Sequence, residues 1–124
     1  MPTPSAFTHL ECTRTGACVD ADDLRNLSEV GAPYFARYNL DAVKASVTRD
    51  DIAARRPDMW RYREVMPLRD GDKPISLREG HTPLVHAWRL GADVGLRDLW
   101  IKDESVNPTG SFKARGLSAA VTAA

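Results

Sequence analysis

The alternation of apolar and polar side chains predicts few regular elements in the first part of the chain. Residues 34–38 read Tyr-Phe-Ala-Arg-Tyr, which places alternate side chains on one face of a short strand. A helical turn is expected over 41–44 and a short helix over 20–27. Residues 1–8 hold prolines and small polar side chains and predict a mobile tail. Residues 10–31 carry too few apolar side chains to build a core alone.

A helix with a clear start is predicted after residue 48. Thr48 precedes the run Asp-Asp-Ile-Ala-Ala-Arg at 50–55, so its hydroxyl can cap the helix. Asp51 stands where a carboxylate favours the first turn, and Pro57 should end the helix. Residues 59–62 are rich in aromatic and arginine side chains and fit a segment that packs against a neighbouring domain.

The last third of the chain has the pattern of an α/β protein. An extended segment is expected over 82–85, a strand over 99–102 and a tight turn over 107–110. Ser111 then stands at the N-cap of a terminal helix. The apolar positions of that helix recur at helical spacing: Leu117, Ala120, Val121 and Ala124. Because this pattern stops without a capping residue, we expect the natural sequence to continue past Ala124.

Composition excludes several classes of partner. The 124 residues include 17 basic and 17 acidic side chains, so net charge gives no reason to expect nucleic acid or an anionic membrane. No apolar run approaches the roughly 18 residues needed to cross a bilayer, and the first ten residues fit neither a secretory signal nor a transit peptide. We therefore expect a cytoplasmic protein. Its two cysteines, Cys12 and Cys18, are expected to be free thiols.

The strongest chemical signal is Lys113, in the first turn of the terminal helix. The positive end of the helix dipole disfavours an ammonium group there, and burial beneath Phe112 and Leu117 would act in the same direction. A lysine that is neutral part of the time is nucleophilic and can form a Schiff base with an aldehyde; a solvated surface lysine is the plain alternative. Gly116 indicates the close approach of a backbone or flat ligand, or else a tolerated glycine. A phosphate-binding P-loop is excluded because Gly-Lys-Ser/Thr does not occur.

Two stretches resemble a known enzyme family. Residues 102–116 read Lys-Asp-Glu-Ser-Val-Asn-Pro-Thr-Gly-Ser-Phe-Lys-Ala-Arg-Gly and resemble the cofactor-lysine segment of the threonine synthases, pyridoxal-phosphate enzymes of fold type II. Residues 77–84, Leu-Arg-Glu-Gly-His-Thr-Pro-Leu, resemble the family's upstream Gly-Glu-Gly-x-Thr-Pro-Leu stretch, with Arg78 where glycine is usual. The two stretches come in the family's order and with its usual gap.

The resemblance implies a pyridoxal 5'-phosphate-dependent lyase that converts O-phospho-L-homoserine and water to L-threonine and phosphate. It implies that Lys113 holds the cofactor as a Schiff base and later moves protons, with Phe112 near the cofactor ring. Lys102, the other lysine of the segment, is expected to be solvated or paired with Asp103 or Glu104. The family's loops for the substrate carboxylate and the cofactor phosphate do not occur here, so we expect this chain to be inactive alone. The full-length enzyme is expected to form a homodimer.

The resemblance extends to the amino-terminal residues. Threonine synthases of this type begin with a zinc-ribbon-like segment of two Cys-x-x-Cys-Gly knuckles. Residues 12–16, Cys-Thr-Arg-Thr-Gly, resemble a first knuckle that has lost its second cysteine, and residues 27–31 stand where the second would be. His9, Cys12 and Cys18 supply at most three ligands, whereas a structural zinc site requires four. We therefore expect a degenerate ribbon without a metal.

These patterns together predict a piece of a three-layer α/β/α enzyme of fold type II. We expect a tail and degenerate ribbon-like segment over 1–44, a helical linker over 45–76, and the start of the catalytic domain over 77–124. Two alternatives stay open. Another fold type II enzyme, such as a cysteate synthase or an amino-acid ammonia-lyase or dehydratase, would keep Lys113 but change the substrate loops. A non-catalytic regulatory or interaction module could retain the motif, and the absorption band of bound cofactor would separate it from an enzyme.

Overall fold

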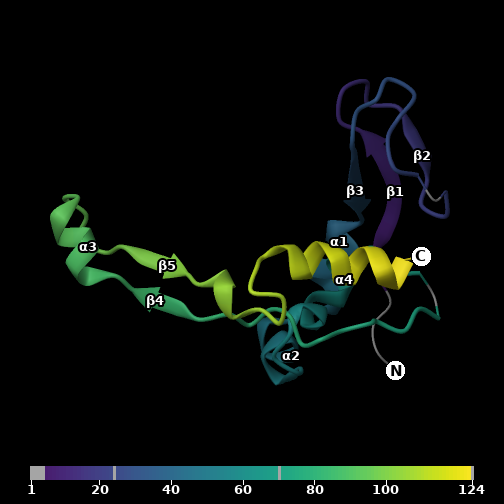
Figure 1. Ribbon diagram of the computed structural model, residues 1–124. Coiled ribbons are helices and arrows are strands. Elements are labelled where there is room, and N and C mark those ends of the chain that lie inside the picture. Colours follow the sequence, from purple (N-terminus) through teal and green to yellow (C-terminus); the bar gives the residue numbers. More distant parts are fainter. Residues whose placement is uncertain (1–4, 24, 70, 124) are drawn as a thin grey trace.

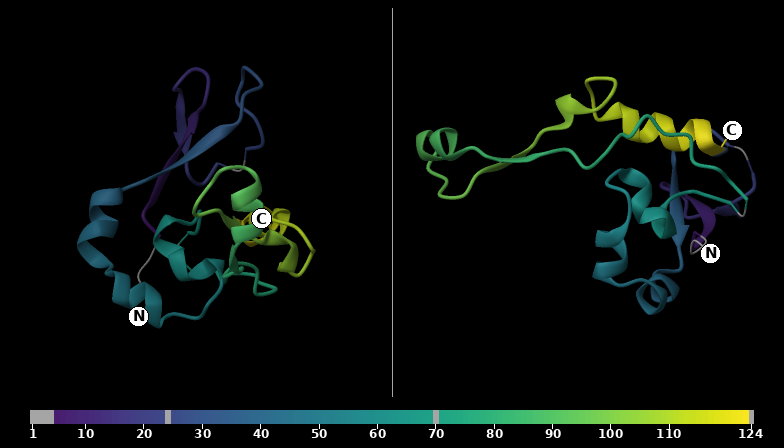
Figure 2. Two further views of the ribbon diagram at one scale, coloured as in Figure 1. Left: turned by 90° about the vertical axis from the view of Figure 1, so that its left-hand side faces the viewer. Right: turned by 90° about the horizontal axis from the view of Figure 1, so that it is seen from below.

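The computed structural model describes residues 5–23, 25–69 and 71–123 as a mixed α/β chain. Figures 1 and 2 show an upright sheet at one end, a helical middle, and a long two-stranded arm at the other end. The yellow helix of the carboxyl-terminal segment lies in the middle, beside the stretch that leads into the arm. None of the helices in these described ranges is long and apolar enough to cross a membrane.

The upright sheet has three antiparallel strands in the order β2-β1-β3. They are β1 (Phe7–Cys12), β2 (Cys18–Asp20) and β3 (Tyr34–Tyr38). Alternate side chains of β3 are half-buried, so the strand predicted over 34–38 is confirmed. The tail predicted over 1–8 is wrong for Phe7 and Thr8, which belong to β1, while residues 1–4 lie outside the described ranges.

The helix predicted over 20–27 is wrong for the residues that the structure describes. Asp20 ends β2 and the others lie in turns, bends or irregular backbone, while Leu24 lies outside the described ranges. A helix does not form here because Asp20 accepts hydrogen bonds that close a turn. Its carboxylate accepts the backbone N–H of Asp22 at 2.9 Å, and its carbonyl accepts that of Asp23 at 3.2 Å. The distant Arg69 also holds this loop, because its guanidinium contacts the Asp22 carboxylate and the Ala21 carbonyl.

Three helical elements follow the sheet: α1 (Leu40–Ser46), α2 (Arg49–Ala54) and the 3-10 segment η1 (Met59–Val65). The predicted start of α2 is confirmed as a reciprocal cap. Thr48 Oγ1 accepts the Asp51 N–H at 3.1 Å, and the Asp51 carboxylate accepts the Thr48 N–H at 2.9 Å. α1 continues to Ser46, whereas the amino-terminal segment was expected to end at residue 44.

A small core forms where η1 meets the stretch 79–82. Met59 and Trp60 of η1 are buried, and the Met59 N–H donates to the Glu79 carbonyl at 2.8 Å. Several polar side chains are buried in the described residues as well: Asp58, Glu64, Glu79, Thr82 and Asn107. A core with this much polar content requires hydrogen-bond partners for each group, and those partners shape the site described below.

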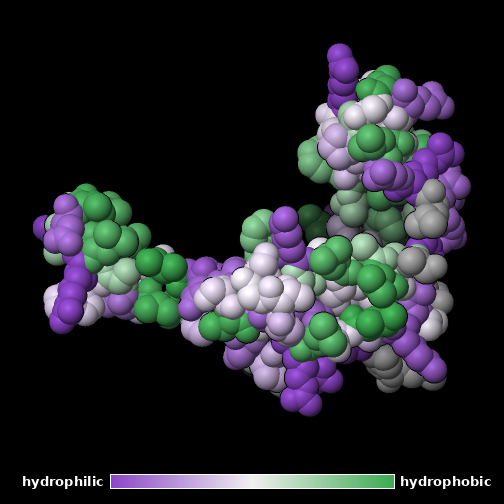
Figure 3. All heavy atoms as spheres, viewed as in Figure 1, coloured by the Kyte–Doolittle hydropathy of each residue, from purple (hydrophilic) through white to green (hydrophobic). Residues whose placement is uncertain are grey.

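The arm is an antiparallel pair of strands, β4 (Leu84–His86) and β5 (Trp100–Lys102), with α3 (Trp88–Asp93) between them. The strand predicted over 99–102 is confirmed, but α3 was not predicted. Figure 3 shows hydrophobic side chains, in green, on the surface of the arm and of the middle. The arm also exposes two aromatic side chains, Trp88 and Trp100. The last elements are the 3-10 turn η2 (Glu104–Val106) and α4 (Lys113–Ala123).

Candidate functional site

The helix α4 begins at Lys113, so the predicted helix and the place of this lysine in its first turn are confirmed. The preceding turn is closed by a hydrogen bond of 2.7 Å from the Gly110 N–H to the Asn107 carbonyl. Gly110 has a φ of +66°, in the left-handed region that glycine adopts without strain. Ser111 then caps the helix as expected, because its Oγ accepts the Lys113 N–H at 3.2 Å.

The Lys113 side chain is exposed, and its ε-amine has no hydrogen bond or ion pair among the residues that the structure describes. The burial considered in the sequence analysis is not present, because Phe112 is 65% exposed and Leu117 is 60% exposed. Together with Arg115 and Gly116 these side chains border an open hollow of about 440 Å³. A Cβ at Gly116 would meet nothing within 4 Å, so no neighbouring backbone approaches it here.

A polar cluster beside Lys113 joins three segments of the chain. The Glu104 carboxylate accepts two hydrogen bonds from Arg115, at 2.7 and 2.8 Å, and one from Thr82 Oγ1 at 2.5 Å. Asn107 Nδ2 donates to the same carboxylate at 2.8 Å, while Asn107 Oδ1 accepts the Gly80 N–H at 3.0 Å. The Arg115 guanidinium, followed by the Thr82 hydroxyl, holds the pKa of Glu104 far below its usual range.

This Glu104 cluster sets the direction of the first turn of α4, because Arg115 lies two residues after Lys113. Sequence reasoning missed the cluster, although all its members lie in the two stretches that carry the resemblance. The Lys102 side chain is exposed, which fits the expectation of a solvated lysine. The Lys102 amine donates to the backbone carbonyl of Thr82, whereas Glu104, one of its expected partners, is bonded to Arg115.

The stretch 77–81 has an unusual backbone that positions Glu79 under α4. Arg78 has a φ of +70° and His81 a φ of +50°, both in the left-handed region. A side chain at Arg78 is strained in this conformation, which glycine would adopt without strain. The Glu79 side chain is buried and accepts the Leu77 N–H at 2.7 Å. Burial acts to raise the pKa of Glu79, but hydrogen bonds, the largest from Ser118, outweigh it and leave the pKa lowered.

The cysteines are both free, but the structure does not bring together the three ligands named from the sequence. His9 and Cys18 gather with Glu11 on one side of the β1–β2 pair, within 4.8 Å of one another. The Glu11 carboxylate is already bound by Arg37 at 2.7 and 2.8 Å. Cys12 is buried and contacts Ser28 Oγ at 3.2 Å instead. Ser28 and neighbouring groups lower the Cys12 pKa to about 7.

The sequence profile of the pyridoxal-phosphate dependent enzymes matches residues 75–124. The threonine synthase of Methanocaldococcus jannaschii is 36% identical over 113 residues, which cover 91% of this chain and 28% of that protein. The chain is a homologue of the threonine synthases. The enzyme of Methanosarcina acetivorans is 32% identical over 94% of this chain and 28% of its own length. That of Mycobacterium leprae is 48% identical over 49% of this chain and 17% of its own length.

The homologous region includes Lys113 and the Glu104 cluster, since both lie within residues 75–124. The chain spans about 28% of the length of the threonine synthases of Methanocaldococcus jannaschii and Methanosarcina acetivorans. No solved structure matches the chain.

Proposed function

We propose that this chain is the amino-terminal part of a pyridoxal 5'-phosphate-dependent threonine synthase. The observation that carries the proposal is the ε-amine of Lys113, which stands at the first residue of α4 without a partner among the described residues, inside the region matched by the cofactor family. The proposed reaction converts O-phospho-L-homoserine and water to L-threonine and phosphate. We further propose that 77–124 opens a three-layer α/β/α catalytic domain, after a ribbon-like segment over 1–44 and a linker over 45–76, in a cytoplasmic homodimer.

The surroundings of Lys113 fit the cofactor. A primary amine without a hydrogen-bond partner is available to an aldehyde carbon. Gly116 follows Lys113 by three residues, so both lie on one face of α4, and the absence of a Cβ leaves that face open to a flat ring. Phe112 is exposed at the edge of the same hollow and offers an aromatic surface to the ring.

The cofactor supplies an electron sink for bond cleavage next to the substrate nitrogen. In this proposal the Lys113 ε-amine would hold the cofactor and would carry protons as a general acid and base. The Glu104–Arg115 pair keeps the first turn of α4 in register with the stretch 79–82, so that the lysine amine returns to the same place after each proton transfer. Phe112 would offer its ring to one side of the cofactor.

Borohydride reduction of the intact enzyme followed by peptide mapping tests this proposal. We expect the reduced cofactor on Lys113, and we expect Lys113→Ala to lower turnover of O-phosphohomoserine by at least about 100- to 10,000-fold. Lys102→Ala is the matched control, because the Lys102 amine donates to the Thr82 carbonyl and should not carry cofactor. Cofactor on Lys102, or near-normal turnover in Lys113→Ala, would overturn the assignment.

The substrate needs its own test. Phosphate release from O-phosphohomoserine, with threonine as the product, is expected of a threonine synthase. An intact protein that binds the cofactor through Lys113 but releases no phosphate from this substrate would instead be another fold type II enzyme. An intact protein without the absorption band of the bound cofactor would be a non-catalytic module.

A further inference from the structure

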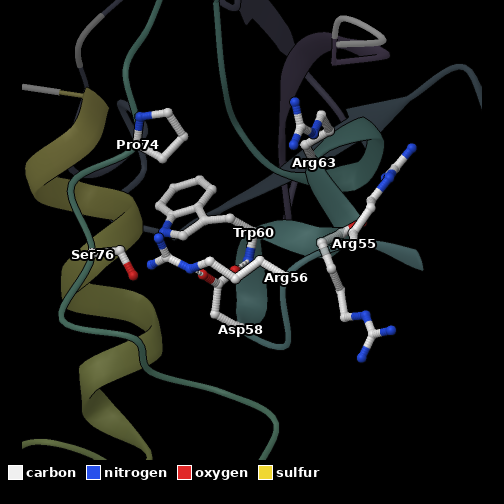
Figure 4. Close-up of a pocket in the computed structure, with 8 residues that line it drawn as sticks. Arg55, Arg56, Asp58, Trp60, Arg63, Pro74 and Ser76 are labelled. Atoms are coloured by element: carbon white, nitrogen blue, oxygen red, sulfur yellow. Dashed lines mark hydrogen bonds and ion pairs between the residues drawn. The ribbon is translucent and has the colours of Figure 1, made fainter. Parts of the chain in front are cut away.

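A second pocket, remote in sequence from Lys113, lies between η1, the end of α2 and residues 74–76 (Figure 4). Its volume is about 180 Å³. The side chains that line it include four arginines, a tryptophan and a serine: Arg55, Arg56, Arg61, Arg63, Trp60 and Ser76. Since a water molecule takes up about 30 Å³ in the liquid, the pocket has room for a group of several heavy atoms.

The pocket holds more positive charge than its carboxylates neutralise. Arg55 is paired with Glu64 at 2.7 Å, and Arg56 is paired with Asp58 at 2.6 Å. Arg61 and Arg63 have no carboxylate partner within residues 5–23, 25–69 and 71–123. Two guanidinium groups at this cavity therefore have no carboxylate partner, although that of Arg61 already donates to the carbonyls of Ile52 and Ala53.

Two buried donors at this pocket have no acceptor. Trp60 is 6% exposed, yet its indole Nε1 has no hydrogen-bond partner, and the same holds for Arg63 Nε. They are the two unpartnered buried donors among the side chains that the structure describes. In Figure 4 the Trp60 indole nitrogen points toward the part of the pocket where Arg56 and Ser76 lie. A buried donor without an acceptor costs about 1–3 kcal/mol, so an acceptor that reached either group from this cavity would stabilise it.

We propose that this pocket binds a phosphate group. Unpartnered N–H donors require an acceptor, and the two arginines without a carboxylate partner require it to be negative. A phosphate carries about −1.5 to −2 charges at neutral pH and several acceptor oxygens, which matches both requirements, whereas a carboxylate supplies one charge. The site is distinct from Lys113 and does not depend on the proposed reaction, because none of its lining residues belongs to α4.

The test follows the Trp60 indole N–H by ¹⁵N–¹H NMR of the intact protein during titration with inorganic phosphate. Trp60→Phe identifies the resonance by its disappearance. We expect phosphate to shift this resonance saturably, and sodium chloride or acetate at equal ionic strength to leave it in place. A saturable shift with O-phosphoserine would assign the site to phosphate esters, and no shift with it would assign the site to free phosphate.

Variants at the arginines complete the experiment. Arg56→Gln and Arg63→Gln should each weaken phosphate binding by roughly tenfold or more, as expected for hydrogen bonds to a charged group. Arg89→Gln is the matched control, since Arg89 lies over the Trp88 ring on α3 and should not affect the titration. The Trp88 and Trp100 resonances report whether each variant is folded. A Trp60 resonance that phosphate leaves unchanged, that chloride or acetate shifts equally, or that titrates with unaltered affinity in both arginine variants would overturn the proposal.

Discussion

Replacing Gly80 by alanine should destabilise the junction between η1 and the stretch that precedes the arm. Gly80 has a φ of +100°, which a residue with a Cβ adopts only under strain. A Cβ at this position would also lie 2.6 Å from the backbone nitrogen of Met59 and 3.1 Å from its Cα. Backbone atoms cannot rotate away as the end of a side chain can, so η1 and residues 79–80 would have to separate.

The magnitude follows from these two effects. A strained φ costs about 1–3 kcal/mol, and overpacking costs about 1–3 kcal/mol more. We therefore expect Gly80→Ala to lower the free energy of unfolding by about 2–6 kcal/mol. The same displacement would weaken the 2.8 Å hydrogen bond from the Met59 N–H to the Glu79 carbonyl and the 3.0 Å bond from the Gly80 N–H to Asn107.

Urea unfolding of the intact protein, followed by tryptophan fluorescence, measures this difference. Gly116→Ala is the matched control, because a Cβ there meets nothing within 4 Å and alanine favours a helix interior. We expect Gly116→Ala to raise stability by up to about 1 kcal/mol in the cofactor-free protein. If Gly80→Ala unfolded within about 0.5 kcal/mol of the parent, or if both alanines destabilised equally, the steric argument would be refuted.

Three further outcomes can be measured. The folded-state pKa of Cys12 is about 7 against an ordinary 9.0, so the unfolded chain binds more protons between these values. Stability should accordingly rise as pH increases from about 7 to 9, a rise that Cys12→Ser removes and Cys18→Ser retains; a flat profile in the parent would contradict it. The purified protein should hold no stoichiometric zinc, and about one zinc per chain, lost on replacing both cysteines, would show the opposite. The pKa of Glu104 is lowered from 4.5, so its ionised form stabilises the fold above that pH and the stabilisation is lost as acid protonates it. Glu104→Gln should therefore lower the free energy of unfolding at neutral pH and make it depend less on acid pH. If the loss of stability in acid were the same in the variant and the parent, the pairing of Glu104 with Arg115 would not be its cause.

The elements that the sequence predicted have local causes. The cap of α2 needs only Thr48 and Asp51, three residues apart, and the start of α4 needs only a glycine turn and Ser111. The strand over 34–38 shows the alternation that a half-buried strand requires. Each of these signals lies within a few residues, so the pattern alone identifies it.

The elements that the sequence missed depend on distant partners. β2 has three residues and forms because β1 pairs with it, which no local pattern announces. The turn after Asp20 wins over a helix partly because Arg69 reaches it from far along the chain. The sequence led us to expect that residues 59–62 pack against a neighbouring domain, and only the fold shows that four arginines around Trp60 line a pocket.

The two stretches that resemble the threonine synthases form one structural unit. An eleven-residue helix that contains a glycine is marginal by itself, so α4 needs contacts outside its own sequence to fix its first turn. Arg115 supplies them, because its guanidinium binds Glu104, and Glu104 in turn binds Thr82 of the upstream stretch. Asn107 ties the turn before α4 to Gly80. Lys113 therefore owes its position to residues about thirty positions earlier in the chain, which explains physically why the upstream motif accompanies the lysine segment.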